Sequence, residues 1–200
     1  HFPVEYHAQT AVEAALALRA EVIKAEGADA IQRLSEIEIG SYDVAIEIIG
    51  RDPEKWHPTT RETADHSFPY CVAVALLDGR VTLHSFDPRR LRDAALQALI
   101  KKVRVVPQPE FAGRYPGAMP TRLTLRTTTG TVYMRHVDVP LGHPGNPMSD
   151  QDVEDKLRRL ASRRIGLAQV EKLIGFVWTL EREKDIATLM PLLRVPHRDA

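Results

Sequence analysis

The sequence predicts an α+β fold, in which a small antiparallel sheet and packed helices are followed by an all-helical C-terminal segment. Three observations carry this prediction. Residues rich in Ala, Leu and Glu come first, alternating polar and apolar residues follow in the middle, and no strand pattern occurs after residue 147. We therefore divide the chain into an α+β unit, residues 1–147, and C-terminal helices, residues 148–200.

The first elements are a helix and a strand. Residues 7–24 predict a helix, because Ala, Leu and Glu are strong helix formers and the apolar residues fall near one face. Residues 35–42 alternate polar and apolar side chains, which suits a half-buried strand. Asp43 then offers an N-cap for a short helix over residues 44–50.

Prolines and glycines delimit the next elements. Thr60 can cap a short helical segment, and Pro69 must start, kink or interrupt the apolar helix that Gly79 ends. Asp87 and Pro88 open another helix, which leads into an apolar strand at residues 103–106.

The remaining α+β sequence predicts a loop and a hairpin. Residues 107–120 hold four prolines and two glycines, so we expect an irregular surface loop. Residues 122–126 and 132–137 both alternate around a Thr/Gly turn, which indicates a β-hairpin. Ser149 and its acidic neighbours then cap a helix, and the sequence after Gly166 is helical with an apolar stripe that needs a partner.

Composition excludes several classes of function. Lys plus Arg and Asp plus Glu are equal at 27 each, so neither nucleic acid nor an anionic membrane is an expected partner. No apolar run approaches the roughly 20 residues that span a bilayer. The single cysteine, Cys71, fits a reducing, cytoplasmic compartment and a place in the core. The first residue is His1 and not Met, which is typical of an internal segment of a longer protein.

Glu5 and His7 form the first candidate catalytic cluster. They precede the first helix, and a carboxylate beside an imidazole can shuttle a proton. A structural interpretation stays open, since Glu favours the positive end of a helix dipole and His is often only a surface residue.

A second cluster surrounds Pro69. Asp65, His66, Ser67 and Tyr70 place polar groups at the mouth of an apolar helix, where they must be paired or must face a cavity. Asp65, His66 and Ser67 do not predict a catalytic triad, because adjacent residues cannot adopt its geometry.

The other histidines and glycines give weaker signals. His143 lies in a Gly-His-Pro segment that can bind an anion or can be only a turn. The sequence has no metal-ligand spacing of histidines and no Gly-rich phosphate loop, so we expect no metal and no nucleotide cofactor.

Three blocks resemble the MmgE/PrpD family, and most closely its 2-methylcitrate dehydratase branch. They are FPVEYHAQTAVEAA at residues 2–15, ADHSFPY at residues 64–70, and VPLGHPGNPMS at residues 139–149, which leads into VEDK. Their order matches the family, and together they extend the resemblance over most of the chain.

The resemblance implies a cofactor-independent lyase or isomerase that acts on small tricarboxylates. It implies a lid over residues 1–147 and terminal helices that rejoin an N-terminal helical half, in cis or in trans, and it suggests a homodimer. Glu5, His7, His66 and Tyr70 become the expected catalytic residues, with Ser67 and His143 binding substrate. The family also places a lysine just before the Phe-Pro pair, outside this sequence. Glu5 stands where decarboxylating relatives place a histidine, which favours dehydration of 2-methylcitrate to 2-methylaconitate in propionate catabolism.

Two alternatives stay open. One is another chemistry of the same family, such as decarboxylation of cis-aconitate or epimerisation and isomerisation of small polycarboxylates. The other is a non-catalytic, stand-alone lid domain.

Overall fold

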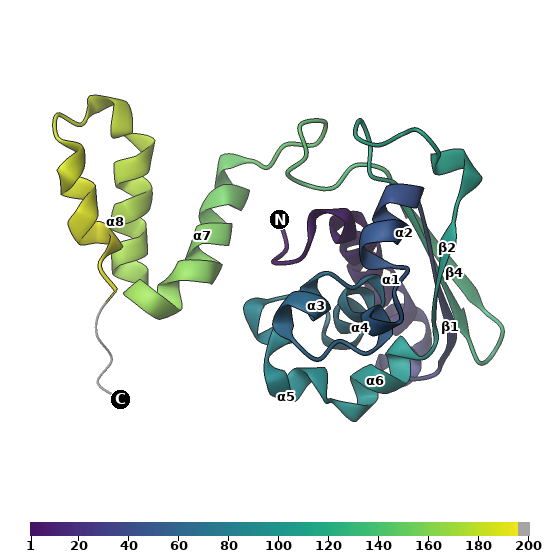
Figure 1. Ribbon diagram of the computed structural model, residues 1–200. Helices are drawn as coiled ribbons and strands as arrows, with labels where there is room; N and C mark the ends of the chain where they lie inside the picture. Colours follow the sequence, from purple (N-terminus) through teal and green to yellow (C-terminus); the bar gives the residue numbers. More distant parts are fainter. Residues whose placement is uncertain (196–200) are drawn as a thin grey trace. The chain divides into compact units, whose positions relative to one another are not determined.

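The computed structural model describes residues 1–195, which form two compact units, His1–Asn146 and the segment from Pro147 onward (Figure 1). The α-helices of the first unit are α1 (Gln9–Glu26), α2 (Asp43–Ile49), α3 (Arg61–Asp65), α4 (Phe68–Asp78), α5 (Pro88–Leu91) and α6 (Ala94–Ile100). Its strands are β1 (Leu34–Ser41), β2 (Val103–Pro107), β3 (Thr121–Thr127) and β4 (Val132–Val137). Short 3-10 helices are η1 (Tyr6–Ala8), η2 (Ala28–Ile31), η3 (Pro53–Trp56), η4 (Leu83–Phe86) and η5 (Pro109–Phe111).

The strands form one mixed sheet in the order β2-β1-β3-β4. The predicted hairpin is confirmed, since β3 pairs antiparallel with β4, and β1 also pairs antiparallel with β3. The expectation of an entirely antiparallel sheet is corrected at one edge, where β2 runs parallel to β1. The helices between these two strands allow the chain to return to the same end of the sheet, as a parallel pair requires.

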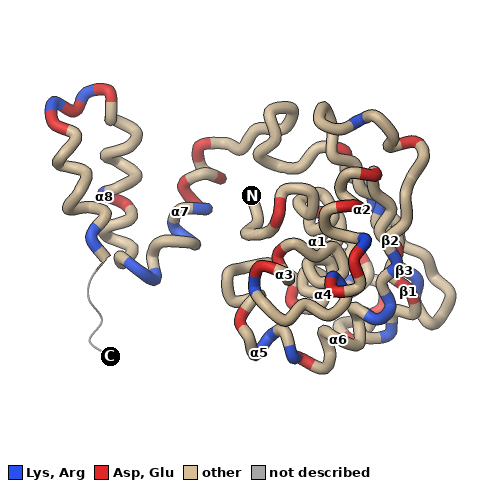
Figure 2. The backbone as a smooth tube through the Cα atoms, in the orientation of Figure 1, with Lys and Arg blue, Asp and Glu red and all other residues tan. Residues whose placement is uncertain are grey.

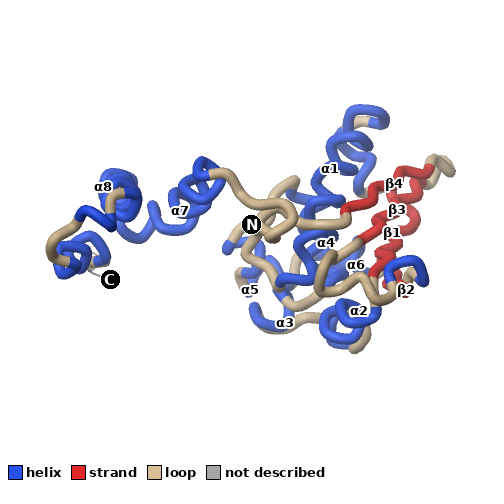
Figure 3. Tube along the Cα trace, turned by 90° about the horizontal axis from the view of Figure 1, so that it is seen from above, coloured by secondary structure: helices blue, strands red, loops and turns tan. Residues whose placement is uncertain are grey.

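Helices cover one face of this sheet. Figure 3 shows α1, α4 and α6 on the same side of the strands, and α1 contacts both β3 and β4. The side chains that point to these helices from the two central strands are fully buried: Ile37, Ile39, Leu123 and Leu125. The alternation of buried and polar residues therefore creates the core on one side of the sheet.

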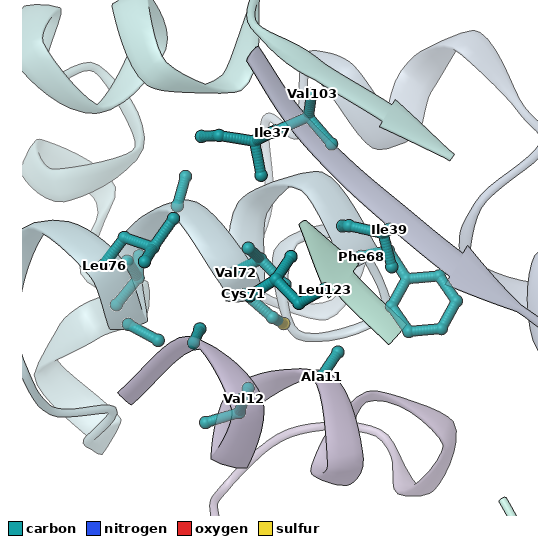
Figure 4. Packing of buried hydrophobic residues seen from close by; sticks show 14 of the residues in the cluster. Ala11, Val12, Ile37, Ile39, Phe68, Cys71, Val72, Leu76, Val103 and Leu123 are labelled. Carbon is teal, nitrogen blue, oxygen red and sulfur yellow. The ribbon is translucent and has the colours of Figure 1, made fainter. Parts of the chain in front are cut away.

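Helix α4 packs against α1 and also contacts the edge strand β2. Figure 4 shows Phe68, Cys71 and Val72 of α4 beside Ala11 and Val12 of α1. All five are fully buried, and burial of each large apolar side chain stabilises the fold by about 1.5–3 kcal/mol. The expectation that Cys71 is a core residue is confirmed, and burial raises the pKa of its thiol above the ordinary range.

The other face of the sheet is polar. Glu36 of β1 forms ion pairs with Arg104 of β2 at 2.9 Å and with Arg126 of β3 at 3.2 Å. These ion pairs give this face both signs of charge. Figure 2 shows that basic and acidic residues are also interspersed along the rest of the chain.

Three predicted helix ends are confirmed. The Thr60 hydroxyl caps α3 by accepting from the Thr63 backbone N–H at 3.2 Å. Pro69 lies in the first turn of α4, where its missing N–H costs nothing. Gly79 ends that helix in the left-handed conformation with φ of 67°, which glycine adopts without steric cost.

Two helix boundaries differ from prediction. Tyr42, not Asp43, is the N-cap of α2, and Asp43 is in the first turn, where its charge favours the helix dipole. The helix expected after Asp87 is broken in two, because the Asp93 side chain accepts from the Leu96 backbone N–H at 2.9 Å and starts α6.

The loop over residues 107–120 is more ordered than expected. It contains η5, and the side chains of Phe111 and Met119 are buried at 1% exposure each. The backbone carbonyl of Met119 accepts a hydrogen bond from the buried Thr10 hydroxyl at 2.8 Å, so α1 holds the end of this loop.

The second unit consists of α7 (Asp150–Ile165), α8 (Leu167–Trp178), η6 (Leu180–Arg182) and η7 (Ile186–Leu193). Ser149 and Asp152 form a capping box at the start of α7, as the acidic first turn predicts. Arg158 joins the two α-helices through Glu171 at 2.7 Å. The apolar stripe is buried at Val170, Leu173 and Ile174 but about half exposed at Val177 and Trp178.

Among residues 1–195, none of the helices is long and apolar enough to cross a lipid bilayer.

Candidate functional site

Glu5 lies at the entrance to the first helical turn. Its carboxylate Oε2 accepts from the His7 backbone N–H at 2.7 Å and caps η1. Its own backbone N–H donates to the Asp65 carbonyl at 3.0 Å, which ties the first residues to the end of α3. The carboxylate is thus held at a fixed place, with a side chain that is 15% exposed.

The imidazole of His7 lies between two polar groups. Its Nε2 is 3.9 Å from Glu5 Oε1, and its Nδ1 shares a hydrogen bond with the Tyr42 hydroxyl. Burial lowers the pKa of His7 below its ordinary value, although the Glu5 charge opposes this shift. Burial also raises the pKa of Tyr42, and the Glu5 charge adds to this effect.

An aromatic pair adjoins this imidazole. The rings of Tyr42 and Tyr115 are stacked with centroids 5.6 Å apart, and His7 lies 5.3 Å from the Tyr115 ring. Both tyrosines line a small hollow of about 120 Å³, which we call the tyrosine hollow. Its other lining residues are Asp43, Val44, Phe111, Ala112 and Gly113. Ligand pockets are commonly about 300–1,000 Å³, so this hollow fits part of a substrate better than a whole one.

The structure brings His143 close to the same turn. Its ring is parallel to the Tyr6 ring at a centroid distance of 6.5 Å. The segment is fixed by Glu13 of α1, whose carboxylate accepts from the Leu141 backbone N–H at 2.7 Å. The first and third blocks of the resemblance therefore meet in space.

His66 lies on the exposed side of the second block. Its Nδ1 is 2.5 Å from Asp65 Oδ1, and its side chain is 51% exposed. Because the Asp65 carbonyl accepts from the Glu5 backbone, His66 belongs to the segment bonded to the Glu5 turn. Its predicted role in catalysis stays a prediction.

Ser67 and Tyr70 lie in the interior. The Ser67 hydroxyl donates to the Lys55 carbonyl at 2.5 Å and accepts from the Tyr70 backbone N–H at 3.0 Å, which caps α4. The Tyr70 hydroxyl donates to the Ser85 carbonyl at 2.6 Å, and the side chain is fully buried. Both side chains thus have structural partners, and their predicted contacts with substrate stay predictions.

The arrangement around Glu5 suits proton transfer. A fixed carboxylate can accept a proton, and a neutral imidazole beside it can donate or accept one. General acid–base catalysis requires such proton-transferring side chains to be held at fixed positions.

The burial of His7 predicts an acid-labile fold. The folded chain resists protonation of His7, whereas the unfolded chain protonates near pH 6.5, the model-compound value. The contribution of neutral His7 to the free energy of unfolding is therefore fully present above about pH 6.5. It decreases as the pH drops from there toward the lowered pKa of the folded chain, by at most about 1.4 kcal/mol per pH unit.

Urea unfolding at several pH values checks this result. His7→Gln should weaken the loss of stability below about pH 6.5, while His57→Gln, which changes an exposed histidine, should retain it. An equal loss of stability in both variants would contradict the assignment to His7.

Sequence reasoning missed Tyr42 and Tyr115. They are far apart in the chain, one at the end of β1 and the other in the Pro/Gly-rich loop, and only the fold stacks them beside His7. The available signal was weak: both tyrosines lie in connections between elements, where functional side chains often lie.

A comparison with known families places the chain in context. Residues 2–182 match the MmgE/PrpD C-terminal domain, and this range covers both the Glu5 turn and α7, α8 and η6 of the second unit.

Individual relatives include two kinds of enzyme. The chain is 33% identical over 147 residues to 2-methylcitrate dehydratase of Escherichia coli (strain K12), which covers 71% of this chain and 29% of the relative. It is 30% identical over 139 residues to cis-aconitate decarboxylase of Mus musculus, covering 70% and 28%. A mitochondrial 2-methylcitrate dehydratase of Yarrowia lipolytica is 28% identical over 184 residues, covering 87% and 34%. The chain thus spans about a third or less of the length of these relatives.

Proposed function

The chain belongs to the MmgE/PrpD family, and from that premise we propose that it supplies the lid and terminal helices of a lyase for a small tricarboxylate. In its most specific form, the proposal is dehydration of 2-methylcitrate to 2-methylaconitate, without a cofactor. The observation that carries it is the fixed Glu5 carboxylate beside the buried His7 ring.

The chemistry of dehydration fits this pair. Elimination of water removes a weakly acidic C–H proton and expels hydroxide with the help of an acid. Glu5 is suited to accept the carbon-bound proton, since its carboxylate is fixed by the His7 backbone N–H. His7 is suited to stabilise the negative charge of the Glu5 carboxylate before it accepts the proton, because the His7 Nε2 atom faces Glu5 Oε1 at 3.9 Å.

The identity of residue 5 favours dehydration over decarboxylation. The family resemblance places a histidine at this position in decarboxylating members, whereas this chain has Glu5. The similarity to the Escherichia coli dehydratase, at 33% identity, supports the same choice but is close to the 30% identity to the mouse decarboxylase. Decarboxylation of cis-aconitate is therefore the second candidate.

We infer that a second protein segment helps to enclose the substrate. The tyrosine hollow has only about 120 Å³, and the apolar stripe of α8 leaves Val177 and Trp178 about half exposed. We propose that an N-terminal helical half, joined to this chain or separate from it, completes the cleft and covers the stripe.

The experiment compares this chain alone with the same chain joined to or mixed with its helical half. We expect 2-methylcitrate to be dehydrated only when both halves are present, as measured by the absorbance of the unsaturated product. A parallel assay measures carbon dioxide released from cis-aconitate.

Each outcome distinguishes one candidate. Carbon dioxide release without dehydration would replace the dehydratase by a decarboxylase. No reaction with either substrate in a folded complex would favour a different polycarboxylate or a non-catalytic lid.

A further inference from the structure

The hydrogen bond between His7 and Tyr42 joins the first turn of the chain to the junction of β1 and α2. We propose that Tyr42 is a positioning residue, whose hydroxyl donates to Nδ1 of His7 and holds the ring in the tautomer with its Nε2–H toward Glu5. This role rests on the proposed function of Glu5 and His7 in proton transfer.

The direction of the hydrogen bond follows from the two neighbours of the ring. A neutral imidazole has one N–H and one nitrogen with a free lone pair. Nε2 of His7 faces a carboxylate oxygen at 3.9 Å, so a proton on this nitrogen is attracted by Glu5. The opposite tautomer would point a lone pair at the same carboxylate. Nδ1 is therefore the acceptor, and Tyr42 is the donor.

Burial keeps both partners in the required form. It lowers the pKa of His7, which favours the neutral ring, and it raises the pKa of Tyr42, which favours the protonated hydroxyl. The titratable side chains that face the ring are Glu5, Tyr42 and Tyr115. The Glu5 charge further raises the pKa of Tyr42 and so also favours its protonated hydroxyl.

The fold holds Tyr42 in place independently of His7. Its backbone is the N-cap of α2, and its ring is stacked on Tyr115 with an interplanar angle of 14°. The side chain is 3% exposed, so solvent competes little for its hydroxyl. Tyr42 can therefore orient the His7 ring, as a fixed outer partner orients a functional histidine.

Tyr42→Phe tests this role without loss of the stacked ring. Nitrogen NMR of the histidine-labelled chain, with His7→Gln to assign the signal, should show the neutral His7 proton on Nε2. In Tyr42→Phe we expect a mixture of tautomers and a higher His7 pKa, because the neutral ring loses its hydrogen-bond donor.

Tyr133→Phe is the matched control. It also removes a tyrosine hydroxyl that donates to a side chain, at 2.9 Å to Glu26, but it lies on β4 away from His7. The His7 signal should not change in this variant. A proton on Nδ1 in the unchanged chain, or the same tautomer and pKa in Tyr42→Phe, would overturn the positioning role.

Kinetics of the assembled enzyme separate this role from the proposed function. Tyr42→Phe should lower kcat about tenfold with little change in KM, and should move the acidic limb of the pH profile upward with the His7 pKa. The expected NMR change without any lyase activity would overturn the proposed function and leave the His7–Tyr42 orientation intact. Lyase activity with an unchanged pH profile in Tyr42→Phe would overturn the positioning role alone.

Discussion

Glu5→Gln is expected to lower the turnover number of the assembled enzyme by about a hundredfold or more, because the amide cannot accept a proton. The substitution is nearly isosteric, and the Gln side-chain oxygen can still accept from the His7 backbone N–H, which now bonds to Glu5 at 2.7 Å. The cap of η1 should therefore survive. Steady-state dehydration of 2-methylcitrate measures the effect, and circular dichroism verifies the fold.

Glu21→Gln provides the control for this variant. Glu21 makes an exposed ion pair with Arg135, and the same chemical change there should leave turnover unaltered because surface ion pairs contribute little. If folded Glu5→Gln retains full turnover, Glu5 is not the group that accepts the proton, and the role passes to another group of the complete cleft.

Local sequence signals predicted most elements of the first unit. Each of these signals depends on residues close together in the chain: the strong helix formers of α1, the polar and apolar alternation in β1, and the turn residues between β3 and β4. The caps at Thr60 and Ser149 are equally local, since each hydroxyl bonds three residues ahead.

Features that depend on distant residues were not predictable in this way. The parallel pairing of β2 with β1 follows from the path of the chain through α2 to α6, and the strand pattern of residues 103–106 contains no sign of it. The break at Asp93 is different, because it is as local as the caps at Thr60 and Ser149: the Asp93 carboxylate accepts from the Leu96 backbone N–H and caps a new helix, a signal that sequence reasoning missed.

The candidate site shows the same division. Glu5 and His7 are neighbours in the sequence, so their pairing could be predicted from spacing. Tyr42 and Tyr115 join them only through tertiary packing. The backbone partners of Ser67 and Tyr70, the Lys55 and Ser85 carbonyls, likewise come from distant parts of the chain, and the predicted contacts of both side chains with substrate stay predictions.

The replacement of Tyr70 should have the largest effect on stability. Tyr70 is fully buried beside Phe86, with ring centroids 5.8 Å apart, and its hydroxyl donates to the Ser85 carbonyl. We expect Tyr70→Ala to lower the free energy of unfolding by about 3–5 kcal/mol, since it leaves a large cavity. Tyr70→Phe should cost about 1–3 kcal/mol, because it removes only the donor to a buried carbonyl. Urea unfolding of both variants measures these values.

Tyr70→Phe also tests the catalytic role that the sequence predicts. Its loss of stability leaves most molecules folded, so turnover can be expressed per folded enzyme. Tyr133→Phe, whose hydroxyl donates to the Glu26 side chain, controls for the loss of a hydroxyl outside the site. A loss of turnover of about tenfold or more in Tyr70→Phe alone would support contact with substrate. Equal turnover per folded molecule in the two variants would show that the Tyr70 hydroxyl has only a structural role, through its bond to the Ser85 carbonyl. The reason is that a side chain that only supports α4 and η4 changes the folded fraction and not the rate per folded molecule.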